Sequence, residues 1–271
     1  HAGAVRSRLP GAPALMRVLY LANNRIGLAC LRVLLDQGDT LAGMALHPPG
    51  RAKCREDMLA LADLPSDQVL PGERIRDPEI EARVRALRPD AVLSVHFGYR
   101  IGPGVLSAAP RGAFNLHPGY LPWNRGLYPN VWSIVEGTPA GATLHRMDEG
   151  IDTGPVVAKR RVEVLPTDTG ETLYHRLEQS AEALFREAWP LVRSGSFPET
   201  PQERAGEGAG TVHTGRDLPA LDRLDPEARM TVRELVDRVR ARSFPPHPGC
   251  YLEGKDGRRV YLRLWLGESP G

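Results

Sequence analysis

From Met16 onward, segments with the hydrophobic pattern of strands alternate with segments with the hydrophobic pattern of helices. Short apolar runs, typical of buried strands, occupy 17–22, 40–46, 91–96, 112–117 and 140–147. Apolar residues spaced by three and four, typical of amphipathic helices, occupy 26–37, 78–87 and 171–193. Strands separated by helices of this length require right-handed crossovers. The pattern therefore predicts an α/β fold with a doubly wound, mostly parallel, Rossmann-like sheet.

The patterning changes after residue 195. Residues 196–217 are rich in Gly, Pro, Glu and Thr and have no apolar period, which predicts a linker. Beyond it, 231–243 predicts a short helix, and 250–253 and 259–266 flank an Asp-Gly turn that predicts a hairpin. We expect four parts: an N-terminal extension or cloning remnant (1–15), a main domain (16–195), the linker (196–217) and a small C-terminal α+β hairpin subdomain (218–271).

Composition narrows the functional classes. The 271 residues carry a formal net charge of +2, which argues against a nucleic-acid partner, because such proteins usually hold phosphates with a basic excess. The three cysteines are widely spaced, which predicts the reducing cytoplasm. No uncharged apolar run approaches the roughly 18 residues of a membrane span, so no membrane partner is expected. The eight histidines form no zinc-binding spacing, so no metal is expected.

Several common chemistries lack their motifs. The turn after the first predicted strand holds a single glycine, Gly27, whereas dinucleotide-binding folds use three at this place. The chain also has neither a phosphate-binding P-loop motif nor the nucleophile elbow of serine hydrolases. In a doubly wound sheet the site is expected beyond the carboxyl ends of the strands.

Polar side chains gather at three of these strand ends. Asn115 and His117 lie two residues apart, so an extended strand points both to one face. A carboxylate-rich turn spans 147–155, and a glycine-containing loop spans 94–100. An amide, an imidazole and a carboxylate are what acyl transfer to an amine requires. Each motif taken alone is more often a capped strand end or a polar turn than a catalytic group, so spacing by itself does not decide between the two interpretations.

The motifs taken together resemble one family. Asn115-Leu-His-Pro-Gly-Tyr-Leu-Pro122, Asn124-Arg-Gly126 and Asp148-x-Gly150-x-Asp152-Thr-Gly-Pro155 resemble the folate-dependent formyltransferases over residues 16–195. That family includes enzymes that act on glycinamide ribonucleotide, methionyl-tRNA and amino sugars. The resemblance implies a catalytic trio of Asn115, His117 and Asp152, with N10-formyltetrahydrofolate as co-substrate and no metal. It implies formyl transfer to an amine through a tetrahedral intermediate, whose oxyanion Asn115 and His117 stabilise.

The resemblance also implies where the folate lies. Relatives hold the pterin ring with the loop and turn that correspond to 97–102 and to the region of Asp148. The expected folate contacts are Phe97, Gly98, Tyr99, Arg100, Ile101 and Asp148.

Three further segments, 120–134, 210–217 and 242–251, resemble the sugar N-formyltransferases more than the tRNA enzyme. This implies a dTDP- or UDP-linked amino sugar as acceptor, and a homodimer formed through the C-terminal hairpin. The expected acceptor contacts are Asn24, Arg25, Tyr120, Arg125, Tyr128, Asn130 and Trp132. Charged and aromatic side chains of this kind suit a pyrophosphate and a base or sugar ring.

Three alternatives stay open. The first is formylation of methionyl-tRNA, which the near-neutral charge disfavours. The second is formylation of an amino acid, a siderophore or a peptide amine by the same trio. The third is a non-catalytic folate-binding module, against which the joint presence of Asn115, His117 and Asp152 argues.

Overall fold

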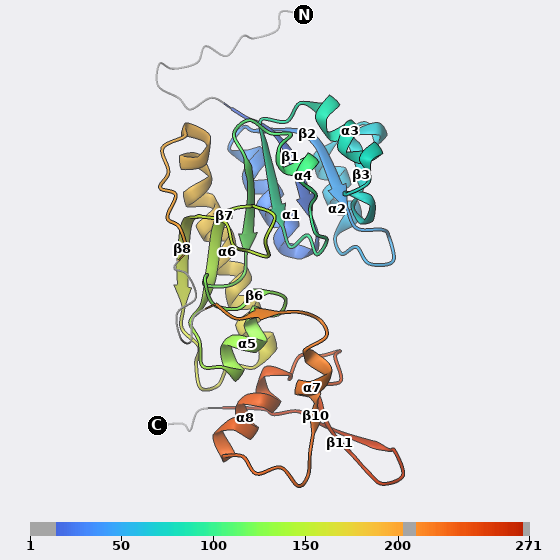
Figure 1. Ribbon diagram of the computed structural model, residues 1–271, viewed down its shortest axis with the longest axis vertical. Coiled ribbons are helices and arrows are strands. Elements are labelled where there is room, and N and C mark those ends of the chain that lie inside the picture. The colour runs from blue at the N-terminus through green and yellow to red at the C-terminus, as the bar shows by residue number, and fades with distance from the viewer. Residues whose placement is uncertain (1–14, 203–209, 268–271) are drawn as a thin grey trace, which may run out of the picture.

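The computed structural model describes residues 15–202 and 210–267. The predicted N-terminal extension falls, up to residue 14, outside the described residues. The molecule is elongated, with a sheet-containing lobe at the N-terminal end and a smaller lobe at the C-terminal end (Figure 1).

A seven-stranded sheet forms the larger lobe, in the order β3-β2-β1-β4-β5-β7-β8. Its strands are β1 (Arg17–Ala22), β2 (Thr40–Leu46), β3 (Val69–Pro71), β4 (Ala91–Val95), β5 (Ala113–His117), β7 (Ala140–Arg146) and β8 (Val156–Val162). The first five of these run parallel, whereas β7 is antiparallel to both β5 and β8. The prediction of a doubly wound, mostly parallel sheet is therefore confirmed.

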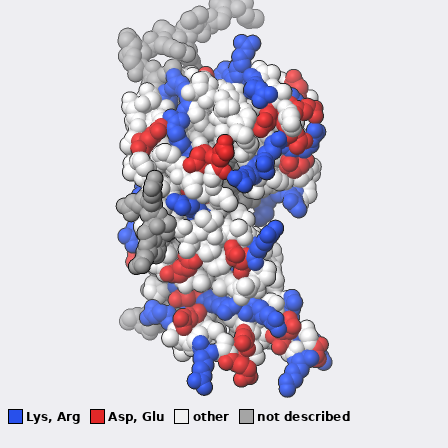
Figure 2. Space-filling model, in the orientation of Figure 1, with Lys and Arg blue, Asp and Glu red and all other residues white. Residues whose placement is uncertain are grey.

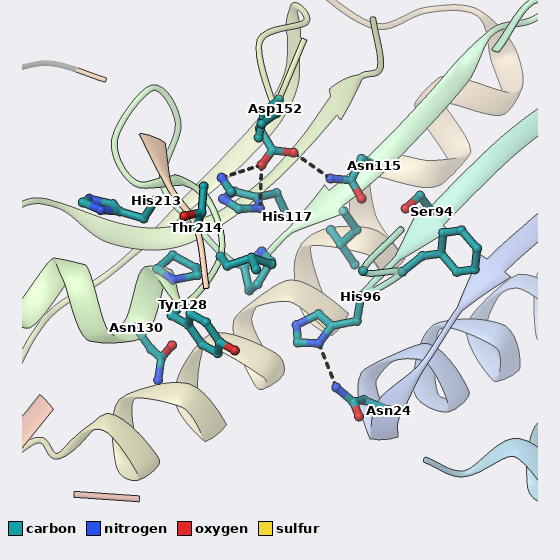
Figure 3. A pocket seen from close by; sticks show the side chains of 18 of the residues that line it. Asn24, Ser94, His96, Asn115, His117, Tyr128, Asn130, Asp152, His213 and Thr214 are labelled. Atoms are coloured by element: carbon teal, nitrogen blue, oxygen red, sulfur yellow. Dashed lines mark hydrogen bonds and ion pairs between the residues drawn. The ribbon is translucent and has the colours of Figure 1, made fainter. Parts of the chain in front are cut away.

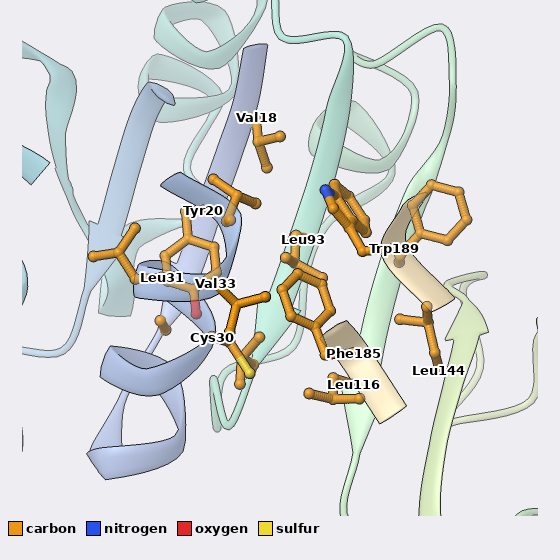
Figure 4. Close-up of a cluster of buried hydrophobic side chains, with 14 of the residues drawn as sticks. Val18, Tyr20, Cys30, Leu31, Val33, Leu93, Leu116, Leu144, Phe185 and Trp189 are labelled. Atoms are coloured by element: carbon orange, nitrogen blue, oxygen red, sulfur yellow. The ribbon is translucent and has the colours of Figure 1, made fainter. Parts of the chain in front are cut away.

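Helices cover both faces of this sheet. On one face α1 (Asn24–Asp36) and α6 (Gly170–Ser194) enclose the larger apolar core, which includes Tyr20, Phe185 and Trp189 (Figure 4). On the other face α3 (Pro78–Leu87) and α4 (Pro103–Leu106) pack Ile80, Val84 and Val105 against the sheet. Further short helices are α2 (Arg55–Ala62) and the 3₁₀ turns Ser66–Gln68 and Gly72–Arg74.

The long helix α6 connects the two lobes. It begins at a capping box, in which the Thr169 side chain accepts a hydrogen bond from the Thr172 backbone N–H, and it ends at Gly195 with a left-handed φ of 73°. Its first turns pack against α5 (Pro129–Val135) and α8 (Val232–Ala241) through Leu173 and Leu177. Because one helix belongs to both apolar clusters, it fixes how the smaller lobe sits on the sheet.

The smaller lobe contains α7 (Leu218–Asp222), α8 and a three-stranded sheet of β10 (Arg223–Leu224), β11 (Cys250–Glu253) and β12 (Arg259–Leu262). The predicted hairpin is the antiparallel pair β11–β12. The segment before this lobe, predicted as a linker, contributes β9 (Val212–His213), which pairs with β6 (Arg125–Gly126) beside the larger sheet. In the part of the chain described, no helix is both long and apolar enough to cross a membrane.

Candidate active site

A cavity of about 740 Å³ lies where the carboxyl ends of β4 and β5 face the smaller lobe. Strand β5 supplies Asn115 and His117, both of which line the cavity, so the predicted shared face is observed. The turn between β7 and β8 supplies Asp152. Figure 3 shows the three side chains converging at one end of the pocket. The structure thus brings the predicted trio together from two separate segments.

Asp152 is the centre of this cluster. Its Oδ1 accepts a hydrogen bond from Asn115 Nδ2 at 3.1 Å, and its Oδ2 accepts one from the Gly126 backbone N–H at 2.8 Å. The same Oδ2 lies 3.5 Å from His117 Nδ1. Its backbone is in the left-handed region, with φ 51°, a conformation that costs energy and that surrounding contacts must hold. The carboxylate is therefore fixed in place from three directions.

Asp152 is ionised in this setting. Burial raises its pKa, but the nearby imidazoles of His117 and His145 and the Gly126 N–H stabilise the carboxylate and hold the pKa well below its usual range. A permanent negative charge beside His117 can orient that ring and stabilise it once it takes up a proton.

His117 is held neutral at neutral pH. Its side chain is 4% exposed, and Nε2 lies 3.3 Å from the Asn124 carbonyl oxygen. Burial lowers its pKa below the usual value, Asp152 opposes this by favouring the charged form, and His145 acts in the same direction as burial. A neutral imidazole next to a carboxylate can accept a proton from an attacking amine.

A fourth member of the cluster is His145, which no sequence pattern indicated. This 1%-exposed residue lines the cavity, its Nδ1 lies 2.6 Å from the Arg146 carbonyl oxygen, and its Nε2 lies 3.4 Å from Asp152 Oδ1. A carbonyl can only accept, so Nδ1 carries a proton, and Nε2 lies 3.3 Å from the Asn115 Nδ2 donor as well as near the carboxylate. His145 stands opposite Asn115 in the antiparallel ladder, a neighbour relation that only the strand pairing reveals.

All six predicted folate contacts line the cavity. Phe97 and Tyr99 pack edge to face with ring centroids 5.5 Å apart, and the Arg100 guanidinium donates to the Glu149 carbonyl at 2.7 Å. Asp148 accepts from the Gly150 N–H at 3.0 Å and from Thr153 Oγ1 at 2.6 Å, which shapes the facing turn. Aromatic faces, apolar Ile101 and free backbone around them suit a flat, hydrogen-bonding heterocycle such as a pterin. Their contact with folate remains a prediction.

The seven predicted acceptor contacts separate into two groups. Asn24, Tyr128 and Asn130 line the cavity, whereas Arg25, Tyr120, Arg125 and Trp132 do not. Arg25 is exposed and, unlike Asn24, does not line the cavity, so its contact with an acceptor remains a prediction. Positions at a predicted strand end or turn share a segment but not a direction, and the side-chain packing decided between them.

The other three residues outside the cavity have partners elsewhere. Tyr120 stacks on Trp123, and the Arg125 guanidinium donates two hydrogen bonds to Gln202 Oε1 at 2.8 and 3.1 Å. Trp132 is 8% exposed and stacks on His213, with centroids 3.9 Å apart. Trp132 therefore supports a cavity residue and does not itself form the wall.

The smaller lobe and the segment before it complete the cavity wall. The lining residues from these segments are His213, Thr214, Leu218, Arg242, Phe244, Pro245, Pro246 and His247. All except Leu218 fall in the segments 210–217 and 242–251, which resemble the sugar N-formyltransferases, but no periodicity indicates them individually. Within the described ranges, no group of three His, Cys, Asp or Glu side chains is placed to hold a metal ion.

Comparison with known proteins places the chain in a family. Residues 48–189 match the formyl transferase family, and residues 217–268 match the N-formyltransferase dimerization C-terminal domain. The methionyl-tRNA formyltransferase of Anaeromyxobacter dehalogenans (strain 2CP-1) is 32% identical over 250 residues, which cover 89% of this chain and 77% of that protein. The chain belongs to the formyl transferase family.

Solved structures agree on the fold. A sugar N-formyltransferase from Shewanella sp. superimposes with a TM-score of 0.80 at 22% identity, covering 95% of this chain and 100% of that one. The formyltransferase PseJ from Anoxybacillus kamchatkensis, solved with UDP-4,6-dideoxy-4-formamido-L-AltNAc and tetrahydrofolate, gives a TM-score of 0.53 at 29% identity, with coverage of 75% and 88%. The protein is therefore a folate-dependent N-formyltransferase.

Proposed function

We propose that this enzyme formylates the amine of a nucleotide-linked amino sugar, carried by dTDP or UDP. The observation that carries the proposal is that residues of the smaller lobe line the same cavity as Asn115, His117 and Asp152. Residues 242 and 244–247 line the cavity together with residues from the strand ends of the sheet, which gives a concave site of about 740 Å³ for a small molecule. Among the solved relatives, PseJ holds a UDP-linked formamido sugar.

The trio divides the work of the transfer. The donor supplies the formyl group, and the Phe97–Ile101 loop and the Asp148 turn hold its heterocycle. Asn115 lines the cavity, and its Nδ2 lies within hydrogen-bond distance of Asp152 Oδ1 and of His145 Nε2. By exchanging one of these partners, Nδ2 can donate a hydrogen bond to an oxygen on which negative charge develops. His117, neutral and next to Asp152, accepts the proton that the attacking amine loses. Asp152 keeps His117 oriented and stabilises its protonated form.

The aromatic side chains of the outer wall suit the acceptor. Phe244 lies 5.3 Å from the Tyr174 ring and 5.6 Å from His247, and these three line the pocket together. Tyr128 adds a further ring, 42% exposed, at the start of α5. Such surfaces stack on a base or pack against a sugar ring, and Lys53 brings a positive charge to the rim for a phosphate.

A second candidate acceptor is methionyl-tRNA, which the 32% identity to the Anaeromyxobacter enzyme favours. Two observations weigh against it. The net charge is only +2, and Lys and Arg are interspersed with Asp and Glu over the face in Figure 2. A tRNA-binding surface depends instead on clustered basic residues.

The proposal includes a homodimer formed through the smaller lobe. Its residues 217–268 match a domain described by its dimerization role. Among its described residues, five large apolar side chains are exposed in the single chain. Two lie on α8, Val232 and Leu235, and three lie on or after β12, Val260 at 65%, Tyr261 at 47% and Trp265 at 91% exposure. Exposed apolar clusters of this kind mark protein–protein contacts.

The test is mass spectrometry of the products formed from N10-formyltetrahydrofolate and a panel of dTDP-, UDP- and GDP-linked amino sugars, with ornithine derivatives and charged initiator tRNA as comparison acceptors. We expect one formyl group to be added to a nucleotide sugar. The variant H117A should lose about 10²- to 10⁴-fold in turnover while remaining folded by circular dichroism, because it loses the proton acceptor. Formylation confined to tRNA or ornithine derivatives would contradict the proposed acceptor.

A further inference from the structure

His96 is a cavity residue to which the reaction so far assigns no part. It follows β4 directly and lines the pocket across from the cluster around Asp152 (Figure 3). Its backbone adopts a left-handed φ of 53°, and its partner Asn24 does the same with φ 64°. Left-handed conformations cost roughly 1–2 kcal/mol for most residues with a side chain, and asparagine adopts them more readily than histidine. Two such residues in direct contact at a pocket wall indicate a functional arrangement.

The contact between them fixes which ring nitrogen of His96 carries the proton. Asn24 Nδ2 lies 3.1 Å from His96 Nδ1, and the amide nitrogen can only donate. Nδ1 is therefore the acceptor, and the proton of the neutral ring resides on Nε2. Burial lowers the pKa of His96 to about 4, and the nearby His117 and Lys53 act in the same direction, so the ring is neutral at neutral pH.

The Nε2–H group of His96 donates no hydrogen bond to the part of the chain that the structure describes. Among the described residues, His96 Nε2 is buried and has no hydrogen-bond partner. An unpaired buried donor costs about 1–3 kcal/mol, so such groups in folded proteins usually serve a ligand or a water. The Tyr174 ring packs edge to face against His96 at 5.9 Å and so limits how the ring can turn. Across the pocket the Tyr128 hydroxyl points toward His96 (Figure 3).

We propose that His96 is a specificity-determining residue that donates a hydrogen bond from Nε2 to an oxygen of the acceptor sugar, while Asn24 acts as the positioning residue that sets its tautomer. This inference rests on the proposed function. A neutral hydrogen-bond donor, His96 Nε2–H, together with the Tyr128 phenol suits a hydroxyl or a carbonyl oxygen of the sugar, because these oxygens carry no charge. The loop of expected folate contacts begins at the next residue, Phe97, so a sugar oxygen bound at His96 would lie next to the formyl donor.

The kinetic test compares the effect of substituting His96 on the KM for the sugar acceptor with its effect on the KM for the formyl donor. Its probe is the dTDP- or UDP-linked amino sugar that the wild-type enzyme formylates fastest, with N10-formyltetrahydrofolate varied independently. H96F should raise the KM for the sugar about tenfold, as expected for one lost buried hydrogen bond, and leave the KM for the donor within about twofold. H96Q, which keeps an N–H, should recover part of the loss. H175F is the matched control, because His175 is half-exposed on α6 and does not line the cavity.

A second measurement needs no acceptor. Nitrogen-15 NMR of the free protein should show His96 protonated at Nε2 and not at Nδ1, and N24A should remove this preference. Protonation at Nδ1 in the wild type would overturn the proposal, as would an unchanged sugar KM in H96F or equal increases in both KM values. If the wild-type enzyme formylates no nucleotide sugar, the proposed function itself fails.

Discussion

At the scale of single residues, the active site depends on one buried carboxylate between two imidazoles. Asp152 stays ionised because His117, His145 and the Gly126 N–H surround it, although burial alone would protonate it. His117 stays neutral because burial outweighs the attraction of Asp152. Both pKa values are lowered, which leaves Asp152 charged and His117 uncharged, so the pair has distinct roles, a fixed negative charge and a proton acceptor.

This balance predicts how His117 titrates. Followed by NMR, His117 should titrate below the usual histidine value of about 6.5. In D152N it should titrate lower still, because the carboxylate favours the protonated ring and the amide does not. An upward shift in D152N would show that Asp152 does not stabilise the imidazolium. Turnover in D152N should fall together with this pKa, and turnover at the wild-type rate would remove Asp152 from the mechanism.

Sequence alone could place part of this cluster. Asn115 and His117 are two apart on a strand, so their common face follows from strand geometry. His145 could not be found in this way, since its proximity to Asn115 depends on β5 pairing antiparallel with β7. Arg125 lies outside the cavity for a related reason. The direction of a long side chain at a turn is set by partners such as Gln202, which lies 77 residues from Arg125.

At the scale of elements, the predicted strands and long helices were found because their periods are strong. Strand β8 was missed because it is an edge strand whose sequence includes Lys159, Arg160 and Arg161. Charged edges protect a sheet from aggregation but hide the strand's apolar alternation. Helix α5 was missed because its seven residues, almost all buried, show no polar face.

Helix α8 gives the prediction at this scale. Its start is fixed by a capping box in which the Thr231 hydroxyl accepts from the Glu234 N–H at 3.1 Å and the Glu234 carboxylate accepts from the Thr231 N–H at 2.6 Å. T231A should lower the free energy of unfolding by about 1 kcal/mol, measured by thermal or urea denaturation. T231S retains the hydroxyl and serves as the control. Equal stability of T231A and the wild type would show that α8 does not need this cap.

At the scale of the whole molecule, two lobes share one cavity and the smaller lobe also carries the exposed apolar side chains of β12 and the segment after it. We expect the protein to be a dimer by light scattering coupled to size exclusion. The double variant V260D/W265D should be monomeric, because charges would be buried at the contact. L191D changes a half-exposed leucine on α6 and should remain dimeric. A monomeric wild type, or a dimeric double variant, would contradict this interface.

The most direct test of the central claim is a comparison of kcat/KM for the best nucleotide-linked amino sugar and for charged initiator tRNA, with the same donor and the same preparation. The cavity shared by both lobes predicts a value for the sugar at least a hundredfold higher, equivalent to about 2.7 kcal/mol of transition-state stabilisation. A higher value for the tRNA would contradict the account, and would mean that the smaller lobe serves a macromolecular acceptor.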